Sequence, residues 1–131
     1  MRPIVFYDED CNFCKSIAAT LGVWDRGGRL RFATIQGPLG DEHLGDLPPE
    51  QRLASFHFVD ERGRRTSGGA ALAPMFASLP AGEALAAGLR LAPGPVDRGY
   101  RWVAANRTAL SRFVPGRFKR WAGRRLRTGA R

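Results

Sequence analysis

The sequence predicts an α/β fold, a small mixed sheet flanked by helices and followed by a C-terminal helical extension. Three observations lead to this prediction. A short apolar run at residues 4–7, an amphipathic helical pattern and an alternating apolar segment at 30–35 follow one another directly, which is typical of a strand–helix–strand unit. Such a unit forms a right-handed parallel crossover. A turn at 60–63 lies between two further short extended segments, and helical patterns fill the chain after residue 70.

Length and composition limit the class of protein. The chain has 131 residues, of which 44% are hydrophobic and 25% charged, so we expect one globular domain with a real core. No apolar run approaches the ~18 residues that cross a bilayer. The apolar run near the N-terminus is too short for a secretory signal. We therefore expect a cytoplasmic protein.

The first part of the chain forms the strand–helix–strand unit. Residues 4–7 are β-branched and aromatic and are bounded by Pro3 and three acids, which predicts a buried strand. We expect a helix from about residue 11 to 25, with Asp10 as its N-cap. Period-two alternation predicts the second strand at 30–35.

The middle of the chain contains the second strand pair. Residues 37–49 are rich in Gly, Pro and acids, which predicts a loop with at most a short helix. Residues 55–59 predict a third strand, and residues 64–66 a short fourth strand after the turn.

Helices account for the rest. We expect one at 70–79, with Pro74 in its first turn, and one at 83–91 closed by residues 93–95. The longest helical pattern runs from 96 to 114 and ends at Pro115. Residues 117–127 predict a last short basic helix.

Charge is divided unevenly along the chain. Residues 1–97 contain 10 Lys and Arg and 12 Asp and Glu, whereas residues 98–131 contain 11 Lys and Arg and no acid. The net charge of +9 therefore belongs to the C-terminal third. We expect one domain at 1–114, including the helical extension, and a basic C-terminal tail at 115–131.

The strongest chemical signal is the pair Cys11 and Cys14, placed where a strand ends and a helix begins. Unpaired N–H groups and the helix dipole favour a thiolate at this place. The CxxC spacing puts the second sulfur one turn later. We expect Cys11 to be the exposed attacking thiol and Cys14 the buried resolving thiol in thiol–disulfide exchange.

Three acids, Asp8, Glu9 and Asp10, precede the pair. Their charge disfavours the thiolate and opposes the dipole. Asp8 could also accept the proton of Cys14 when a mixed disulfide is resolved. The structural alternative for Asp8 and Asp10 is helix capping.

Two other interpretations of the cysteines stay open. They could be two small core residues, or they could bind zinc together with His43 and His57. The spacing to those histidines matches no zinc finger, and His57 lies within a predicted strand. We therefore predict no metal site.

The sequence resembles the DCC family of predicted thiol-disulfide oxidoreductases, which is named for an Asp and two Cys. The resemblance spans most of residues 3–113: it lies in residues 6–14, Asp25, residues 30–32, 67–71 and 100–107. It implies a thioredoxin-like fold and a reductase-type activity, with Asp8, Cys11 and Cys14 as the motif residues. The sequence has Glu9 where the family often has Gly. Residues 53–55 stand where the wider thioredoxin group places a cis-proline.

Asn106 and Arg107 lie near an apolar helix face and therefore need polar partners. One interpretation is that they shape the site by anchoring Asp8 or a substrate carboxylate. The other is a structural contact with a loop or a carbonyl.

The basic end interleaves cations with aromatic residues. The pattern at 117–127 suits an anionic membrane or a membrane protein, and phosphate or an acidic partner would also be attracted. No nucleic-acid-binding motif is present, so we do not expect specific nucleic-acid binding. The structural alternative is a solvated terminus whose aromatic residues pack on the domain. The contributing residues are Arg117, Phe118, Lys119, Arg120, Trp121, Arg124, Arg125, Leu126 and Arg127.

The sequence as a whole predicts a thiol–disulfide oxidoreductase of the protein-disulfide reductase type that needs no cofactor. Its substrates would be protein or small-molecule thiols and disulfides. The alternative is a non-catalytic thioredoxin-like binding module, brought to a membrane or an acidic partner by its basic tail.

Overall fold

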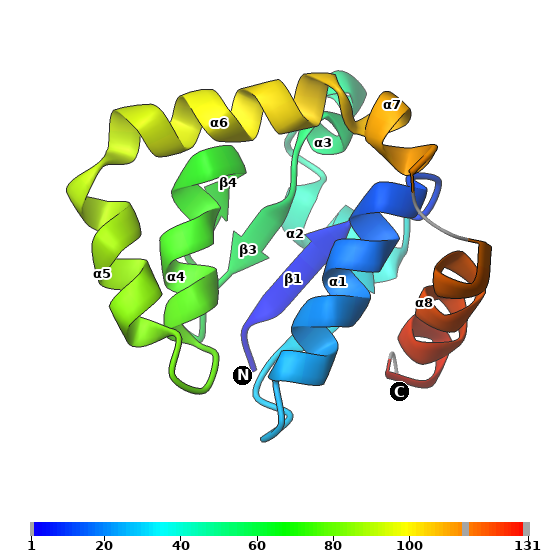
Figure 1. Ribbon diagram of the computed structural model, residues 1–131, viewed down its shortest axis with the longest axis horizontal. Helices are drawn as coiled ribbons and strands as arrows, with labels where there is room; N and C mark the ends of the chain where they lie inside the picture. The colour runs from blue at the N-terminus through cyan, green and yellow to red at the C-terminus, as the bar shows by residue number, and fades with distance from the viewer. Residues whose placement is uncertain (1, 114–115, 130–131) are drawn as a thin grey trace.

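The computed structural model describes residues 2–113 and 116–129. Within them, four strands form one mixed sheet in the order β2-β1-β3-β4. Helices lie over both faces of this sheet and continue to the C-terminal end (Figure 1). The predicted fold class is therefore confirmed.

The strand–helix–strand unit consists of β1 (Ile4–Tyr7), α1 (Asn12–Trp24) and β2 (Arg31–Thr34). β1 and β2 are parallel and pair from Ile4 with Arg31 to Tyr7 with Thr34. All four β1 residues are buried because each face of the sheet is covered. Val5 packs with the α1 and α4 side chains, whereas Ile4 and Phe6 pack with Leu44 of α2.

The second strand pair is β3 (His57–Val59) and β4 (Arg65–Ser67), which are antiparallel. β3 also lies antiparallel to β1. β1 and β3 are thus the two central strands, and the carboxyl end of β1, where the cysteines follow, lies next to the start of β3.

Two short helices stand where the sequence predicts mainly a loop. They are α2 (Pro38–Leu44) and α3 (Pro49–Ala54). Each begins with a proline at its first helical position, where the missing N–H costs nothing and the fixed φ suits the helix. α2 is the short helix that the prediction allowed within residues 37–49, whereas α3 lies mostly in residues 50–54, for which no element is predicted.

A 3₁₀ turn precedes the next helix. The segment predicted as one helix from residue 70 is η1 (Gly68–Ala71) followed by α4 (Leu72–Ala77). Pro74 lies in the first turn of α4, as predicted. α5 (Glu83–Leu91) has the predicted bounds.

The predicted single helix at 96–114 is wrong. It begins earlier, as α6 (Pro93–Ala105), and a break at Asn106 separates it from α7 (Arg107–Ser111). Pro93 starts α6 instead of closing α5. The predicted end at Val114 and the break at Pro115 lie outside the described residues.

The basic C-terminal segment forms α8 (Gly116–Gly129) and packs alongside α1 (Figure 1). Ala122 and Leu126 are buried with Ala18 and Ala19 of α1. Small side chains allow the two helices to approach closely. Arg125 also donates to the carbonyl oxygen of Gly22 at 3.1 Å. The division of the chain at 114/115 stays a prediction.

Within residues 2–113 and 116–129, no helix combines the length and the apolar character needed to cross a bilayer.

Candidate active site

The two cysteines lie at the junction of β1 and α1. Cys11 is the N-cap of α1, with extended backbone, and its Sγ accepts the N–H of Cys14 at 3.2 Å. The thiol therefore occupies the position that an aspartate or serine oxygen takes in an ordinary cap. The prediction that Asp10 caps this helix was wrong.

Both thiols are buried. Cys11 is 9% exposed and Cys14 5%, so the prediction of an exposed Cys11 was also wrong. The physical reason is the cap itself, because an N-cap side chain turns back over the first turn of its helix.

The environment separates the pKa values of the two thiols. The pKa of Cys11 is lowered to about 6, first by the Cys14 side chain as hydrogen-bond donor and then by the Cys14 N–H and the positive charge of Arg107; burial and Asp8 act against this. The pKa of Cys14 is strongly raised by that same hydrogen bond and by burial. The site therefore favours the thiolate at Cys11 and the protonated thiol at Cys14.

Asp8 directly follows β1 and is buried beside the pair. Its Oδ1 accepts the N–H of Asp10 at 2.9 Å and the side-chain amide of Gln36 at 2.7 Å. Gln36 in turn accepts the N–H of Glu9 at 3.2 Å. These contacts fix the carboxylate in place, while Glu9 and the side chain of Asp10 are exposed.

Arg107 reaches the same site from α7. Its Nη2 lies 3.8 Å from Oδ2 of Asp8, and its charge lowers the pKa of both cysteines. Ser111 fixes α7 to the first turn of α1, because its Oγ accepts the N–H of Phe13 at 3.2 Å and donates to the carbonyl oxygen of Arg107 at 2.8 Å.

Asn106 is not brought to the cysteines by any described contact. Its side-chain amide donates to the carbonyl oxygen of Trp102 at 2.7 Å, at the end of α6. Asp25 is also structural: it accepts the N–H groups of Arg29 and Leu30 at 3.0 and 2.9 Å and so closes the turn from α1 to β2.

Sequence reasoning missed Gln36 and Ser111. Gln36 lies two residues after the end of β2, and the carboxyl ends of parallel strands meet at one edge of a sheet, so its position next to Asp8 could have been found. Ser111 gave no comparable signal, since its role depends on the break at Asn106.

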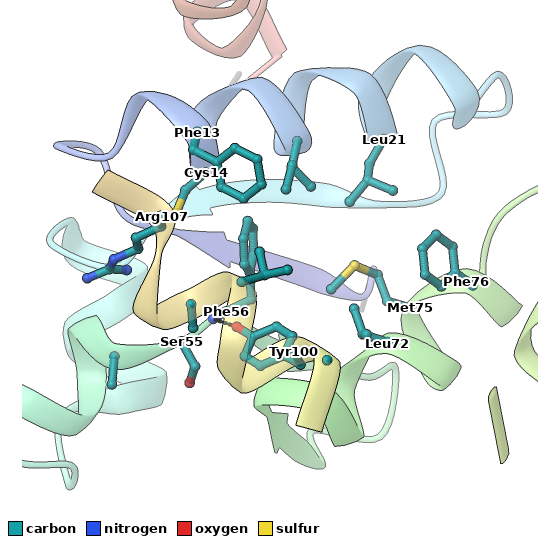
Figure 2. A pocket seen from close by; sticks show the side chains of 15 residues that line it. Phe13, Cys14, Leu21, Ser55, Phe56, Leu72, Met75, Phe76, Tyr100 and Arg107 are labelled. Atoms are coloured by element: carbon teal, nitrogen blue, oxygen red, sulfur yellow. Dashed lines mark hydrogen bonds between the residues drawn. The ribbon is translucent and has the colours of Figure 1, made fainter. Parts of the chain in front are cut away.

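A mostly apolar pocket of about 310 Å³ opens beside Cys14. Figure 2 shows Phe13, Cys14 and Leu21 of α1 along one side and Tyr100 of α6 with Leu72 of α4 along the other. Ser55 and Phe56, just before β3, and Arg107 also line it.

Tyr100 connects α6 to the segment before β3. Its hydroxyl oxygen accepts the N–H of Phe56 at 2.7 Å, and burial raises the pKa of Tyr100. Gly69 allows the close approach of η1 to α6, since a Cβ there would lie 2.9 Å from Cα of Asp97.

The histidines have structural contacts. His57 is buried, and its ring nitrogens lie 2.6 Å from Oγ of Ser67 and 2.8 Å from the carbonyl oxygen of Arg52. His43 lies against the ring of Phe6. Within the part of the chain that the structure describes, no three His, Cys, Asp or Glu residues gather as a metal site would require.

Comparison with protein families matches residues 5–113 to the DCC1-like thiol-disulfide oxidoreductase family. Comparisons with curated proteins and with solved structures found no match. The family match covers most of the chain, including the junction of β1 and α1, and the Cys11–Cys14 pair lies at the start of α1. The chain therefore belongs to the DCC1-like thiol-disulfide oxidoreductase family.

Proposed function

We propose that this protein is a disulfide reductase in which Cys11 attacks and Cys14 resolves. The observation that supports this most strongly is the capped thiol of Cys11, with its pKa of about 6. A thiolate is the nucleophile of thiol–disulfide exchange, and here it forms at neutral pH beside a second thiol.

The reaction has two balanced steps. The Cys11 thiolate attacks one sulfur of the substrate disulfide, whose other sulfur leaves as a thiolate and takes a proton from solvent. Cys14 then loses its proton, attacks Sγ of Cys11 and releases the first substrate sulfur as a thiol. Two electrons pass to the substrate, and the protein is left with a Cys11–Cys14 disulfide.

Asp8 serves the second step. Cys14 is buried, so the proton that it loses when it attacks needs an acceptor close by, and Asp8 is the buried carboxylate of the site. Arg107 balances the charge of Asp8 and of the Cys11 thiolate, so it shapes the site without reacting. Asp10 contributes its main-chain N–H to Asp8.

Trapping of the mixed disulfide tests the proposal. Cys14→Ser, incubated with oxidised glutathione as the probe, should retain one glutathione on Cys11, measured by the mass of the intact protein. The wild type should pass on to its internal disulfide. The matched control is Cys11→Ser, which keeps one buried thiol and should form little adduct.

If Cys14→Ser forms no adduct and its Cys11 does not react with iodoacetamide, the reductase proposal is wrong, and the non-catalytic binding module is the better interpretation. Equilibration of the pair with glutathione redox buffers determines the direction. A reductase should be mostly dithiol at a cytosolic poise near −250 mV.

We also propose that the region around α8 contacts anionic membranes. Phe113 is 82% and Phe118 36% exposed, and Arg112, Arg117 and Arg120 beside them are exposed too. A groove of about 550 Å³ between α1 and these two phenylalanines is almost wholly apolar. Ala122 and Leu126, by contrast, face α1 and are not free to enter a lipid surface.

Sedimentation with vesicles tests this contact. The protein should bind vesicles that contain phosphatidylserine and not those of phosphatidylcholine alone, and high salt should release it. The double variant Phe113→Ala/Phe118→Ala should weaken binding several-fold, whereas Trp102→Ala, which removes an exposed aromatic residue of α6, should not. Equal binding by both variants, or none by the wild type, would contradict the proposal.

A further inference from the structure

The segment that faces Cys14 across the pocket has no free main-chain group at Phe56. The N–H of Phe56 donates to the Tyr100 hydroxyl at 2.7 Å, and its carbonyl oxygen accepts the N–H of Gly68 at 3.0 Å. An extended peptide binds a strand by pairing with such groups. At Phe56, both main-chain groups already have a partner within the protein.

Helix α6 covers the same side of the site. It supplies Gly99, Tyr100, Val103 and Ala104 to the pocket wall, and Figure 2 shows Tyr100 lying between α6 and Phe56. A polypeptide segment that entered the pocket would have to displace α6, whereas a small molecule would not. Cys11 lies next to the pocket, since its Sγ is 3.2 Å from the main-chain nitrogen of Cys14, so a small disulfide held there can present its sulfur to Cys11.

The pocket itself has the size and chemistry of a small-molecule site. About 310 Å³ is near the lower end of the range for ligand pockets. Its walls are aromatic and aliphatic side chains, with the Cys14 sulfur among them. Among the described residues that line it, Arg107 is the charged one, and at 3.8 Å from Asp8 its guanidinium is too distant to be engaged in a short hydrogen bond there.

We propose that the substrate is a small disulfide with an apolar body and a carboxylate, whose body enters this pocket and whose carboxylate meets Arg107. The inference rests on the proposed reductase function and specifies its substrate class. The exchange steps are unchanged: the small disulfide gains two electrons and two protons and leaves as thiol, and Cys11 and Cys14 become a disulfide.

A series of linear disulfides tests the apolar contact. Dithiodiglycolate, 3,3′-dithiodipropionate and 4,4′-dithiodibutyrate keep the carboxylates and add one methylene to each arm at each step. Rate constants for oxidation of the reduced protein, divided by those of free 2-mercaptoethanol, should rise about fourfold for each step, as expected for one buried methylene. Oxidised glutathione, a polar peptide disulfide, should show no such gain.

A variant whose pocket is filled should no longer react faster with disulfides of longer chain. Gly99 lines the pocket, and a Cβ there meets nothing within 4 Å, so Gly99→Leu should fold and should make the normalised rates independent of chain length. The matched control is Gly88→Leu, an equally open glycine of α5, which should keep the trend. Ala104→Leu gives a second filled pocket if Gly99→Leu does not fold.

The charge is tested by the bis-amide of 4,4′-dithiodibutyrate. The wild type should react several-fold faster with the acid than with the amide. In Arg107→Gln the two rate constants should be equal, even if both are lower than in the wild type.

Wild-type rates that merely follow those of 2-mercaptoethanol, or an unchanged trend in Gly99→Leu, would overturn the substrate assignment and leave the reductase intact. An equal rate for wild type and Cys11→Ser with every disulfide would instead overturn the reductase proposal.

Discussion

At the scale of single residues, the pKa of Cys11 depends first on the hydrogen bond from Cys14 and on burial, and two opposite charges then adjust it. Asp8 raises the pKa of Cys11, and Arg107 lowers it. Both groups face the thiol from outside α1, one from the end of β1 and one from α7. The sequence predicted the acid from its place beside the cysteines. It offered Arg107 as only one of two interpretations, because Arg107 is 96 residues from Cys11 in the chain and only the fold brings it near.

Alkylation as a function of pH tests this balance. The rate constant of the reduced protein with iodoacetamide should rise with a midpoint near pH 6, well below the ~8.5 of a free thiol, because only the thiolate reacts. Arg107→Gln should raise the midpoint, and Asp8→Asn should lower it.

Lys15→Gln is the matched control, since it removes a cation from the first turn of α1 itself, and it should shift the midpoint least. Unchanged midpoints in both the Arg107 and the Asp8 variants would contradict the assigned causes.

At the scale of elements, the prediction of secondary structure succeeded where hydrophobic periodicity was clear and failed at several prolines. The strands and α1 could be predicted because their buried faces leave a periodic pattern of apolar residues in the sequence. Proline is ambiguous, because it ends one helix and starts another: it starts α2, α3 and α6. The break at Asn106 has no comparable mark, yet it directs Arg107 to the site.

The contact between η1 and α6 gives a prediction at this scale. Gly69→Ala should destabilise the protein by about 1–3 kcal/mol, because the added Cβ would lie 2.9 Å from Cα of Asp97 and push α6 away. Urea denaturation measures the change. Gly88→Ala in α5, where a Cβ meets nothing within 4 Å, should instead stabilise by about 0.5–1 kcal/mol; equal effects would contradict the close approach.

At the scale of the whole molecule, many of the basic residues behind the charge asymmetry lie in α8, a helix that packs on the domain. For residues 117–127, the sequence left open contact with an anionic membrane or an acidic partner, and a solvated terminus whose aromatic residues pack on the domain. Ala122 and Leu126 are buried against α1, so this part of the chain contributes to the core. Composition could not reveal this, because the alanines of α1 that receive it look like ordinary helix residues.

The packing of α8 predicts a loss of global stability. Leu126→Ala should lower the free energy of unfolding by about 2–5 kcal/mol, as for other buried leucines, measured by urea denaturation of the full chain. Arg120→Ala, an exposed position of the same helix, should change it by no more than about 0.5 kcal/mol. If Leu126→Ala lowers the free energy of unfolding no more than Arg120→Ala does, α8 does not stabilise the domain.

The pairing of α1 with α8 also affects the order in which the protein can fold during synthesis. Residues 18 and 19 leave the ribosome about a hundred residues before their partners, Ala122 and Leu126. Until then, the face of α1 that adjoins the cysteines is without its cover, and contacts so far apart in the chain form slowly. Until α8 has been made, the nascent chain thus carries an apolar, thiol-bearing surface without its cover.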